Sequence, residues 1–241
     1  LYWQVDTPTT ADLTVKAQLT TSQGAMVETK QSTLGSAFPT SRWQGGRTVA
    51  TYVDLPIPVT ALSGALQPTL QFAAPGGASV VVSTFPALKI VARPRTYTVP
   101  PIPVPRQADF AGSIALLGYG LQPATDGTIK PGQTIDLSMY WKDVKGMTTS
   151  YKVFTHLLGP DGRIYGQEDA IPLNGNAPTN GWLPGEILTD HYQITVAANA
   201  PPGNYQIVVG FYDPISGVRL SLTNGQGDTF ALTSLHLAGT R

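Results

Sequence analysis

The amino-acid sequence predicts an all-β protein of two tandem antiparallel β-sandwich domains, Ig-like or jelly-roll-like, of which the first lacks its opening strand. Three observations support this fold class. The composition favours strands and turns, because only 12% of the residues are charged and there are 25 glycines and 21 prolines. The chain repeats itself once over its 241 residues. Short alternating segments are separated by turn residues.

The composition also excludes several classes of function. With 15 basic and 15 acidic residues the formal net charge is zero, so no overall field attracts nucleic acid. Cysteine is absent, which removes disulfides, thiolate catalysis and cysteine metal sites. No run of about 20 apolar residues occurs, so we expect no membrane insertion by this segment. The low charge and the many Thr and Ser residues favour an extracytoplasmic location, on a bacterial surface or outside the cell.

The internal repeat emerges when the chain is aligned with itself. Tyr2 and Trp3 align with Tyr140 and Trp141 at an offset of 138, which becomes 139 after one inserted residue. The further matched pairs are Val15 with Val153, Leu19 with Leu157, Gly24 with Gly162, Pro39 with Pro178, Thr40 with Thr179, Trp43 with Trp182, Gly46 with Gly185, Gly64 with Gly203, and Phe72 with Phe211. Matches of rare residue types in one order indicate a duplication, and two repeats of this length indicate two domains.

The repeat places the domain boundaries. We predict an incomplete module over residues 1–95, a Pro-rich linker over residues 96–106, and a complete module over residues 107–241. Prolines occupy four of the positions 100–105. Such a segment adopts polyproline II geometry and acts as a semi-rigid spacer.

The first module is predicted to begin in mid-strand. Leu1 aligns with Met139, so the first module has no counterpart of residues 107–138. Either another chain supplies the missing strand or the sequence is a fragment of a longer one. Because an incomplete sandwich exposes unpaired backbone groups, Leu1, Tyr2 and Trp3 form the predicted strand-acceptor region.

The second module carries the clearest strand patterns. Residues 151–158 alternate as expected for a strand with one packed face and one partly exposed face. Asp161-Gly162 follows as a tight hairpin turn, so the chain should reverse there. A second turn at residues 201–203 leads into a strand that ends before Asp213 and places four side chains on one face: Tyr205, Ile207, Val209 and Phe211.

A series of motifs runs in order along the second module: the strand Tyr151 to Leu158, Gly159-Pro160-Asp161-Gly162-Arg163, Pro178-Thr179, Trp182 with Pro184-Gly185-Glu186, Asp190, Pro201-Pro202-Gly203 with Tyr205, Gly210-Phe211-Tyr212-Asp213, and Arg219-Leu220. Residues 110–240 thereby resemble the β-sandwich domain that follows the membrane portion of many bacterial mannosyltransferase-like proteins and occurs in other bacterial surface proteins. Over residues 1–92 the likeness is faint. The resemblance implies an extracytoplasmic accessory module without established catalytic residues.

The acidic residues of the second module allow two interpretations. Glu168, Asp169, Glu186 and Asp190 form the one cluster of acids, and a glycosidase needs two carboxylates that flank one bond. Alternatively, acids such as Asp169 and Glu186 brace loops by accepting backbone N–H bonds. We favour bracing, because the first module has Arg47 and Thr51 where the second has Glu186 and Asp190.

No metal and no cofactor are predicted. The histidines His156, His191 and His236 show no short ligand spacing. The Gly-rich polar loops at Asp126-Gly127 and from Asn224 to Asp228 match no full calcium loop, so we expect ordinary turns there. The sequence holds no Gly-rich phosphate loop and no Gly-x-Ser-x-Gly elbow.

The aromatic residues leave a core role and a binding role open. Trp3 and Trp141 are predicted to lie in the cores. Trp43 and Trp182 stand in loops beside Gly and Pro, where they serve as structural plugs or as platforms for sugar rings, and we favour plugs. A sugar-facing patch, if present, is predicted to comprise Trp182, Tyr192 and Tyr165 with Glu186 and Asp190.

These observations favour a non-catalytic structural or assembly module of a bacterial cell-surface or extracellular protein. In this hypothesis the chain is a filament or layer subunit joined by strand complementation between chains. Its expected partners are further copies or neighbouring modules of a longer chain. The alternative is a carbohydrate-binding accessory module of a glycan-handling membrane protein. An enzyme ranks last, and fold class alone cannot decide among the three.

Overall fold

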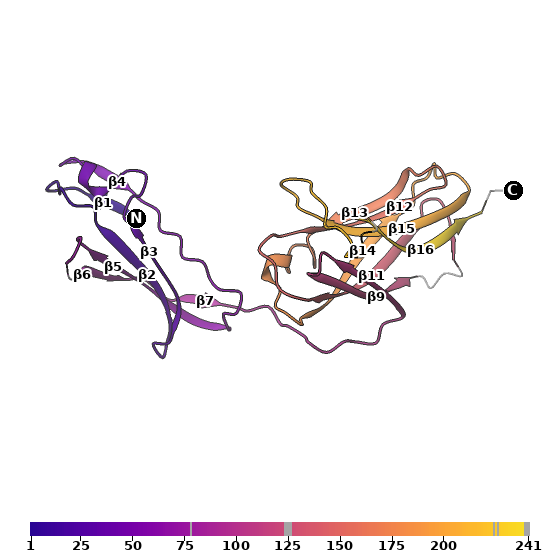
Figure 1. Ribbon diagram of the computed structural model, residues 1–241, viewed down its shortest axis with the longest axis horizontal. Coiled ribbons are helices and arrows are strands. Elements are labelled where there is room, and N and C mark those ends of the chain that lie inside the picture. The colour runs from indigo at the N-terminus through magenta and orange to yellow at the C-terminus, as the bar shows by residue number, and fades with distance from the viewer. Residues whose placement is uncertain (78, 123–126, 224, 226, 239–241) are drawn as a thin grey trace. The chain divides into compact units, whose positions relative to one another are not determined.

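The computed structural model describes residues 1–77, 79–122, 127–223, 225 and 227–238. The chain divides into two compact units, Leu1–Arg93 (unit 1) and Pro94–Arg241 (unit 2). The predicted all-β fold class is confirmed, because the described residues form antiparallel sheets with two 3₁₀ turns and no α-helix (Figure 1). None of the helices in the described part of the chain has the length and apolar character that crossing a membrane requires.

Unit 2 is a sandwich of two sheets. The four-stranded sheet has the order β14 (Ile187–Thr195), β11 (Thr134–Asp143), β9 (Ile114–Gln122), β8 (Val104–Phe110). The five-stranded sheet has the order β10 (Thr128–Ile129), β16 (Phe230–Leu237), β15 (Gly203–Tyr212), β12 (Lys152–Leu158), β13 (Ile164–Ala170). Neighbouring strands are antiparallel except β10 and β16, which pair in parallel.

The strand patterns predicted for this unit are confirmed, except that Phe154, on the face of β12 predicted to be partly exposed, is buried. In β12 the side chains of Val153, Thr155 and Leu157 are fully buried, whereas His156 and Leu158 are half-buried. The Gly159 N–H donates to the Arg163 carbonyl, which closes the predicted turn into β13. In β15 the four side chains predicted to share one face are all fully buried: Tyr205, Ile207, Val209 and Phe211.

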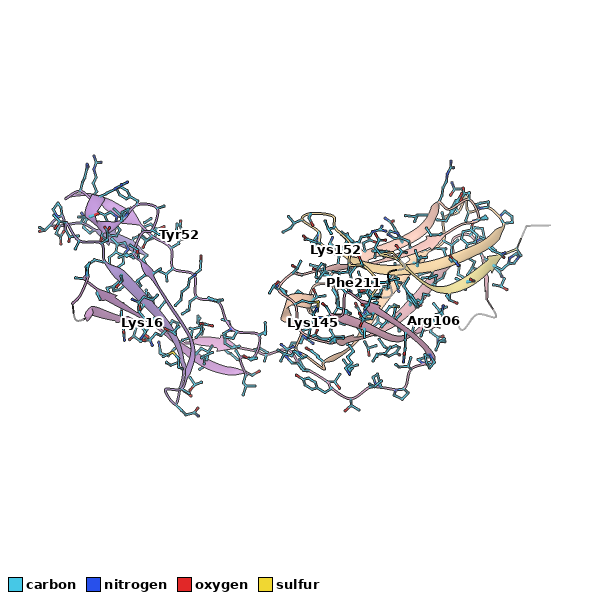
Figure 2. The ribbon with its side chains drawn as sticks, viewed as in Figure 1. Lys16, Tyr52, Arg106, Lys145, Lys152 and Phe211 are labelled. Atoms are coloured by element: carbon cyan, nitrogen blue, oxygen red, sulfur yellow. The ribbon has the colours of Figure 1, made fainter. Side chains whose placement is uncertain are left out.

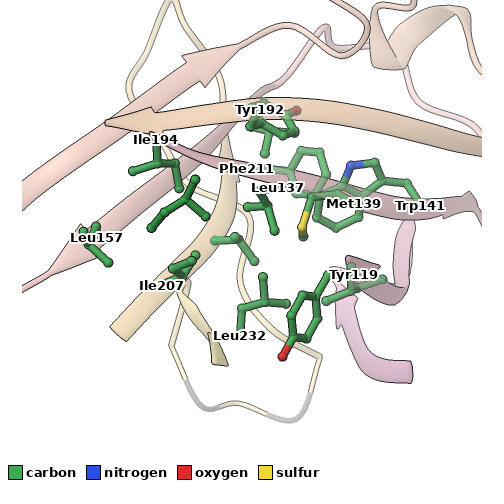
Figure 3. Close-up of a cluster of buried hydrophobic side chains, with 14 of the residues drawn as sticks. Tyr119, Leu137, Met139, Trp141, Leu157, Tyr192, Ile194, Ile207, Phe211 and Leu232 are labelled. Carbon is green, nitrogen blue, oxygen red and sulfur yellow. The ribbon is translucent and has the colours of Figure 1, made fainter. Parts of the chain in front are cut away.

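The core of unit 2 contains a triangle of aromatic rings. The Trp141 ring lies edge-on to the rings of Phe110 and Phe211, with centroid distances of 6.1 and 4.9 Å. Phe110 and Phe211 are 5.2 Å apart. Figure 3 shows Trp141 and Phe211 among the apolar side chains that both sheets contribute. Such edge-to-face pairs stabilise a core beyond the area that they bury.

Unit 1 has one larger sheet and a two-stranded ribbon. The sheet has the order β3 (Met26–Thr33), β2 (Thr14–Thr21), β5 (Gly64–Ala73), β6 (Ser79–Thr84), and β7 (Leu88–Ile90) also pairs with β5. The ribbon consists of β1 (Tyr2–Gln4) and β4 (Thr48–Ala50). Its register pairs Trp3 with Val49. By the repeat, β1 corresponds to the second half of β11, and β4 to the start of β14.

A buried Thr and Trp pair recurs in both units. A 3₁₀ turn begins at Thr40 in unit 1 and at Thr179 in unit 2. The Thr179 hydroxyl donates to the Thr149 carbonyl and accepts the Tyr151 N–H (2.8 and 2.9 Å). Thr40 does the same with Ala11 and Leu13 (2.7 and 2.8 Å). The indole N–H groups of Trp43 and Trp182 donate to the carbonyls of Phe38 and Ala177, each at 2.8 Å.

The predicted spacer at residues 96–106 is built into unit 2. The Ile187 N–H donates to the Thr96 carbonyl (2.8 Å), and the two residues form a β-bridge. Val104 and Pro105 are the first residues of β8. Because β8 is an edge strand, Pro105 can sit there without breaking the ladder of the sheet interior.

Candidate functional site

The outer edge of β1 is the candidate site. The Thr51 N–H donates to the Leu1 carbonyl, and the Val5 N–H donates to the Arg47 carbonyl (2.9 and 3.0 Å). Because residues of an antiparallel strand alternate in the edge toward which their backbone groups point, those of Tyr2 and Gln4 face away from β4. Among the described residues of unit 1, no strand pairs with this edge.

The same edge is covered in unit 2. There β11 pairs with β14 on one side and with β9 on the other. Tyr140 and Lys142, which correspond to Tyr2 and Gln4, lie opposite Gly118 and Ala115 of β9. The described part of unit 1 therefore lacks the strand that completes the equivalent sheet of unit 2.

A cavity of about 300 Å³ opens in unit 1. Its lining combines core side chains with the segment that follows β4: Leu1, Ala17, Thr51, Tyr52, Val53, Asp54, Leu55, Pro68, Leu70 and Phe85. Tyr52, labelled in Figure 2, is 89% exposed at this place. At the equivalent positions of unit 2, Met139, Tyr192, Ile194 and Ile207 lie together with Tyr119 of β9 in the core (Figure 3).

The aromatic triangle is incomplete in unit 1. Trp3 lies edge-on to Phe72 with a centroid distance of 4.9 Å, equal to that of the corresponding Trp141 and Phe211. The third ring of unit 2, Phe110, comes from the end of β8, which has no counterpart in the described residues of unit 1. Trp3 is accordingly only half-buried, whereas Trp141 is fully buried. The prediction that Trp3 lies in the core is therefore only partly confirmed.

The predicted strand-acceptor residues therefore lie where the sheet is open. Leu1 lines the cavity, and Tyr2 lies on the open edge with 84% of its surface exposed. Trp3 belongs to the incomplete aromatic triangle. Repeat alignment located these three residues from the sequence. It did not identify Leu55 and Phe85, because their contribution to the cavity depends on how the segments after β4 and β6 cross unit 1.

The predicted sugar-facing patch is not on the surface. Trp182 and Tyr192 are 2% and 1% exposed, and Glu186 and Asp190 are fully buried as well. Tyr165 is half-buried, and its hydroxyl donates to Asp161 (2.9 Å). Rings that stack on sugars must offer a free face to solvent. The patch is therefore corrected to a set of core and loop-bracing residues, and the plug interpretation of Trp182 is confirmed by its burial.

The buried acids brace loops. Glu186 forms an ion pair with Arg95 and accepts the Leu183 N–H (3.1 Å). Asp190 accepts the Leu173 N–H (2.9 Å) and a hydrogen bond from the Tyr192 hydroxyl. Burial raises the pKa of Asp190 above its ordinary value, although these hydrogen bonds oppose the shift. Burial also raises the pKa of Tyr192 well above its ordinary value, and the charge of Asp190 adds to that shift.

The remaining chemistry-bearing side chains have structural partners. Asp169 lies 3.2 Å from the His156 ring, and Glu168 accepts the Gln193 N–H. His191 and His236 contact Ser138 and Asn204 (3.0 and 2.9 Å). The described residues contain no group of three or more His, Cys, Asp or Glu side chains placed to hold a metal ion. Of the two loops considered for calcium, Asp126, Asn224 and Gln226 lie outside the described residues.

Comparisons with known proteins leave the family open. No family model matches the chain, and none of the curated proteins matches it in sequence. Solved structures with some likeness include the C-terminal domain of wzt, at 15% identity over 57% of this chain and 81% of that one, with a TM-score of 0.38.

Two further matches are proteins of Corynebacterium diphtheriae and Streptococcus agalactiae. A putative membrane anchored protein from Corynebacterium diphtheriae is 14% identical over 95% of this chain and 53% of its own, with a TM-score of 0.27. The C-terminal domain of the Streptococcus agalactiae AgI/II polypeptide BspA is 10% identical over 95% and 85%, with a TM-score of 0.27. At these identities and TM-scores, the likeness identifies neither the family nor the function of this chain.

Proposed function

We propose that this chain is a non-catalytic structural module of a bacterial surface or extracellular protein, and that unit 1 completes its sandwich with a β-hairpin from a neighbouring polypeptide. One observation carries the proposal. The edge of β1 and the cavity beside Leu1 are open, whereas β8 and β9 cover the equivalent edge of β11 in unit 2.

Physical chemistry supports a hairpin as the occupant. An open strand edge presents N–H and C=O groups that another strand can pair with, and the pairing gains affinity from main-chain hydrogen bonds. Alternate side chains of the added strand enter the core and give specificity. Such an addition would close the cavity and cover the half-buried ring of Trp3. Subunits linked head to tail in this way form open filaments unless the rotation closes a ring.

The glycan-binding alternative loses its predicted site. Four of its five residues are buried in unit 2: Trp182, Tyr192, Glu186 and Asp190. We therefore advance strand acceptance alone.

A self-complemented chain tests the proposal. Residues 104–138 are copied directly before Leu1, since Leu1 aligns with Met139, so that the added segment can supply the hairpin in cis. A labelled peptide of residues 102–122 should bind the original chain and should not bind the fused chain. A fusion with Leu116→Asp in the added copy is the control, because a buried charge should prevent docking and restore peptide binding. Equal binding to the original and fused chains, or binding to neither, would contradict strand acceptance.

A further inference from the structure

We infer that the hairpin accepted by unit 1 carries a defined side-chain pattern: an aromatic residue, an x-Gly-x turn, then Ile-x-Leu-x-Gly-aromatic. The pattern is that of residues 110–119 of unit 2, read through the internal repeat. The inference rests on the proposed function and specifies its partner. It names which side chain of the donor meets which residue of unit 1.

The register follows from β9. In unit 2, Gly118 lies opposite Tyr140, Leu116 opposite Trp141 and Ile114 opposite Asp143, with a bulge that skips Leu117. The repeat replaces these β11 residues by Tyr2, Trp3 and Val5. The donor therefore places Gly against Tyr2, Leu against Trp3 and Ile against Val5. Ile114 and Leu116 are fully buried in unit 2, so the same positions of the donor enter the core.

The donor's first aromatic residue completes the aromatic triangle of unit 1. Phe110 packs edge-on against both Trp141 and Phe211. In unit 1, Trp3 and Phe72 have the same centroid distance as Trp141 and Phe211, also in an edge-on arrangement, without a third ring from the β8 position. An aromatic side chain at the donor's equivalent of Phe110 fits the third position of this triangle. An aliphatic side chain there would leave part of the Trp3 ring exposed.

The donor's second aromatic residue fits the cavity. Tyr119 lies opposite Met139, which corresponds to Leu1. Met139 directs its backbone groups to β14, so it forms a non-hydrogen-bonded pair with Tyr119, in which side chains come closest. Leu1 lines the cavity of about 300 Å³ in unit 1, which has room for a ring at this position.

Two features of the hairpin require glycine. Ala111 and Gly112 have φ values of 54° and 63°, the central conformation of a β-turn that favours Gly at its second position, and Ser113 completes the connection between the paired Phe110 and Ile114. A Cβ on Gly118 would lie 2.4 Å from the Val104 carbonyl oxygen and 2.5 Å from Ile102. The donor's returning strand can approach the first one only if this position is Gly.

Peptide variants test the pattern on the full chain. Labelled peptides of residues 102–122 are titrated as the parent and with Phe110→Ala, Tyr119→Ala, Gly118→Ala or Gln107→Ala. Loss of a buried aromatic should weaken binding at least about 100-fold. The exposed Gln107 is the matched control and should leave binding unchanged. Phe110→Ala should have little further effect on a Trp3→Leu chain, because the two side chains share one contact.

The outcomes separate the two proposals. If the parent peptide binds and the aromatic and glycine variants bind equally well, the pattern is wrong while strand acceptance stands. If no peptide binds the original chain, the proposed function fails, and the pattern fails with it.

Discussion

Single residues at equivalent positions differ in charge between the two units. Val5 lies in the core of unit 1, where its N–H donates to the Arg47 carbonyl. Asp143 makes the same backbone bond in unit 2, to the carbonyl of Glu186 (2.9 Å). Its Oδ1 accepts the Gly146 N–H (2.9 Å), and its buried Oδ2 has no hydrogen-bond partner among the described residues. Burial raises the pKa of Asp143 above its ordinary value, and the charge of Glu186 adds to that shift.

This raised pKa predicts a pH dependence. The folded protein retains the Asp143 proton at pH values where the unfolded chain has lost it, so the free energy of unfolding falls as pH rises from the ordinary pKa of 3.8 through the raised one. Asp190 contributes in the same direction. Asp143→Asn should reduce the slope, as measured by urea denaturation of unit 2 across this range. An unchanged slope would show that Asp143 titrates normally.

Gly118 is predicted to be intolerant of a side chain. Its Cβ would collide with the Val104 carbonyl, which is held by the pairing of β8 with β9, and with Ile102, which lies two residues before β8 begins. Gly118→Ala should therefore destabilise unit 2 by about 1 to 3 kcal/mol in chemical denaturation. Gly181→Ala is the matched control, because its Cβ would meet only Pro178 at 3.8 Å. Equal stabilities of the two variants would contradict the close approach.

In each unit, the repeated Thr and Trp pair attaches the loop that contains the 3₁₀ turn to neighbouring backbone groups. The Thr179 hydroxyl is fully buried and links two backbone groups, those of Thr149 and Tyr151. Trp182 follows the 3₁₀ turn, is buried, and donates to the Ala177 carbonyl. Unit 1 repeats the arrangement with Thr40. Attachment of this loop therefore explains why both units carry Pro-Thr and Trp at equivalent positions.

Removal of one hydroxyl tests this attachment. Thr179→Val keeps the shape of the side chain but leaves the Thr149 carbonyl and the Tyr151 N–H without their buried partner. We expect a loss of about 2 to 4 kcal/mol in the unfolding free energy of unit 2. Thr179→Ser keeps both hydrogen bonds and should recover most of the loss. A Val variant as stable as the Ser variant would exclude a role of these bonds.

The elements that the sequence predicts best are those with strong local signals. The alternation in β12 and the Gly turns around it identify the strand and its partner without tertiary information. The sequence was less informative for Trp182, because a Trp beside Gly and Pro suits a surface platform as well as a buried plug. Burial depends on which loop folds over it. The Pro-rich stretch before β8 likewise reveals its bridge to Ile187 only in three dimensions.

At the scale of the whole molecule, the two units differ in how complete they are. Unit 2 has two full sheets around an extensive core, whereas unit 1 has one sheet, a short ribbon and a smaller core cluster. The open edge follows from the repeat, because aligned copies show what each lacks, whereas the attachment of residues 96–106 to unit 2 is visible only in the structure. The repeat also specifies the side-chain pattern of the donor hairpin, but it does not specify which polypeptide carries that pattern.

Two unfolding transitions are therefore expected in calorimetry. Unit 1 should unfold first, because hydrophobic burial is the main stabilising contribution and its core is smaller. The hairpin peptide should raise only the lower transition, since a ligand of the native state stabilises the unit that binds it. Peptide that raises the upper transition instead would indicate binding to unit 2.

Amide hydrogen exchange of the original chain, measured residue by residue, tests the open edge most directly. Tyr2 and Gln4 should exchange rapidly in the monomer, because their N–H groups face away from β4, whereas Tyr140 and Lys142 should be protected by β9. Addition of the residue 102–122 peptide should slow the exchange of Tyr2 and Gln4 and leave Tyr140 and Lys142 unchanged. If Tyr2 and Gln4 are as protected as Tyr140 and Lys142 in the peptide-free monomer, unit 1 has no open edge and the account is wrong.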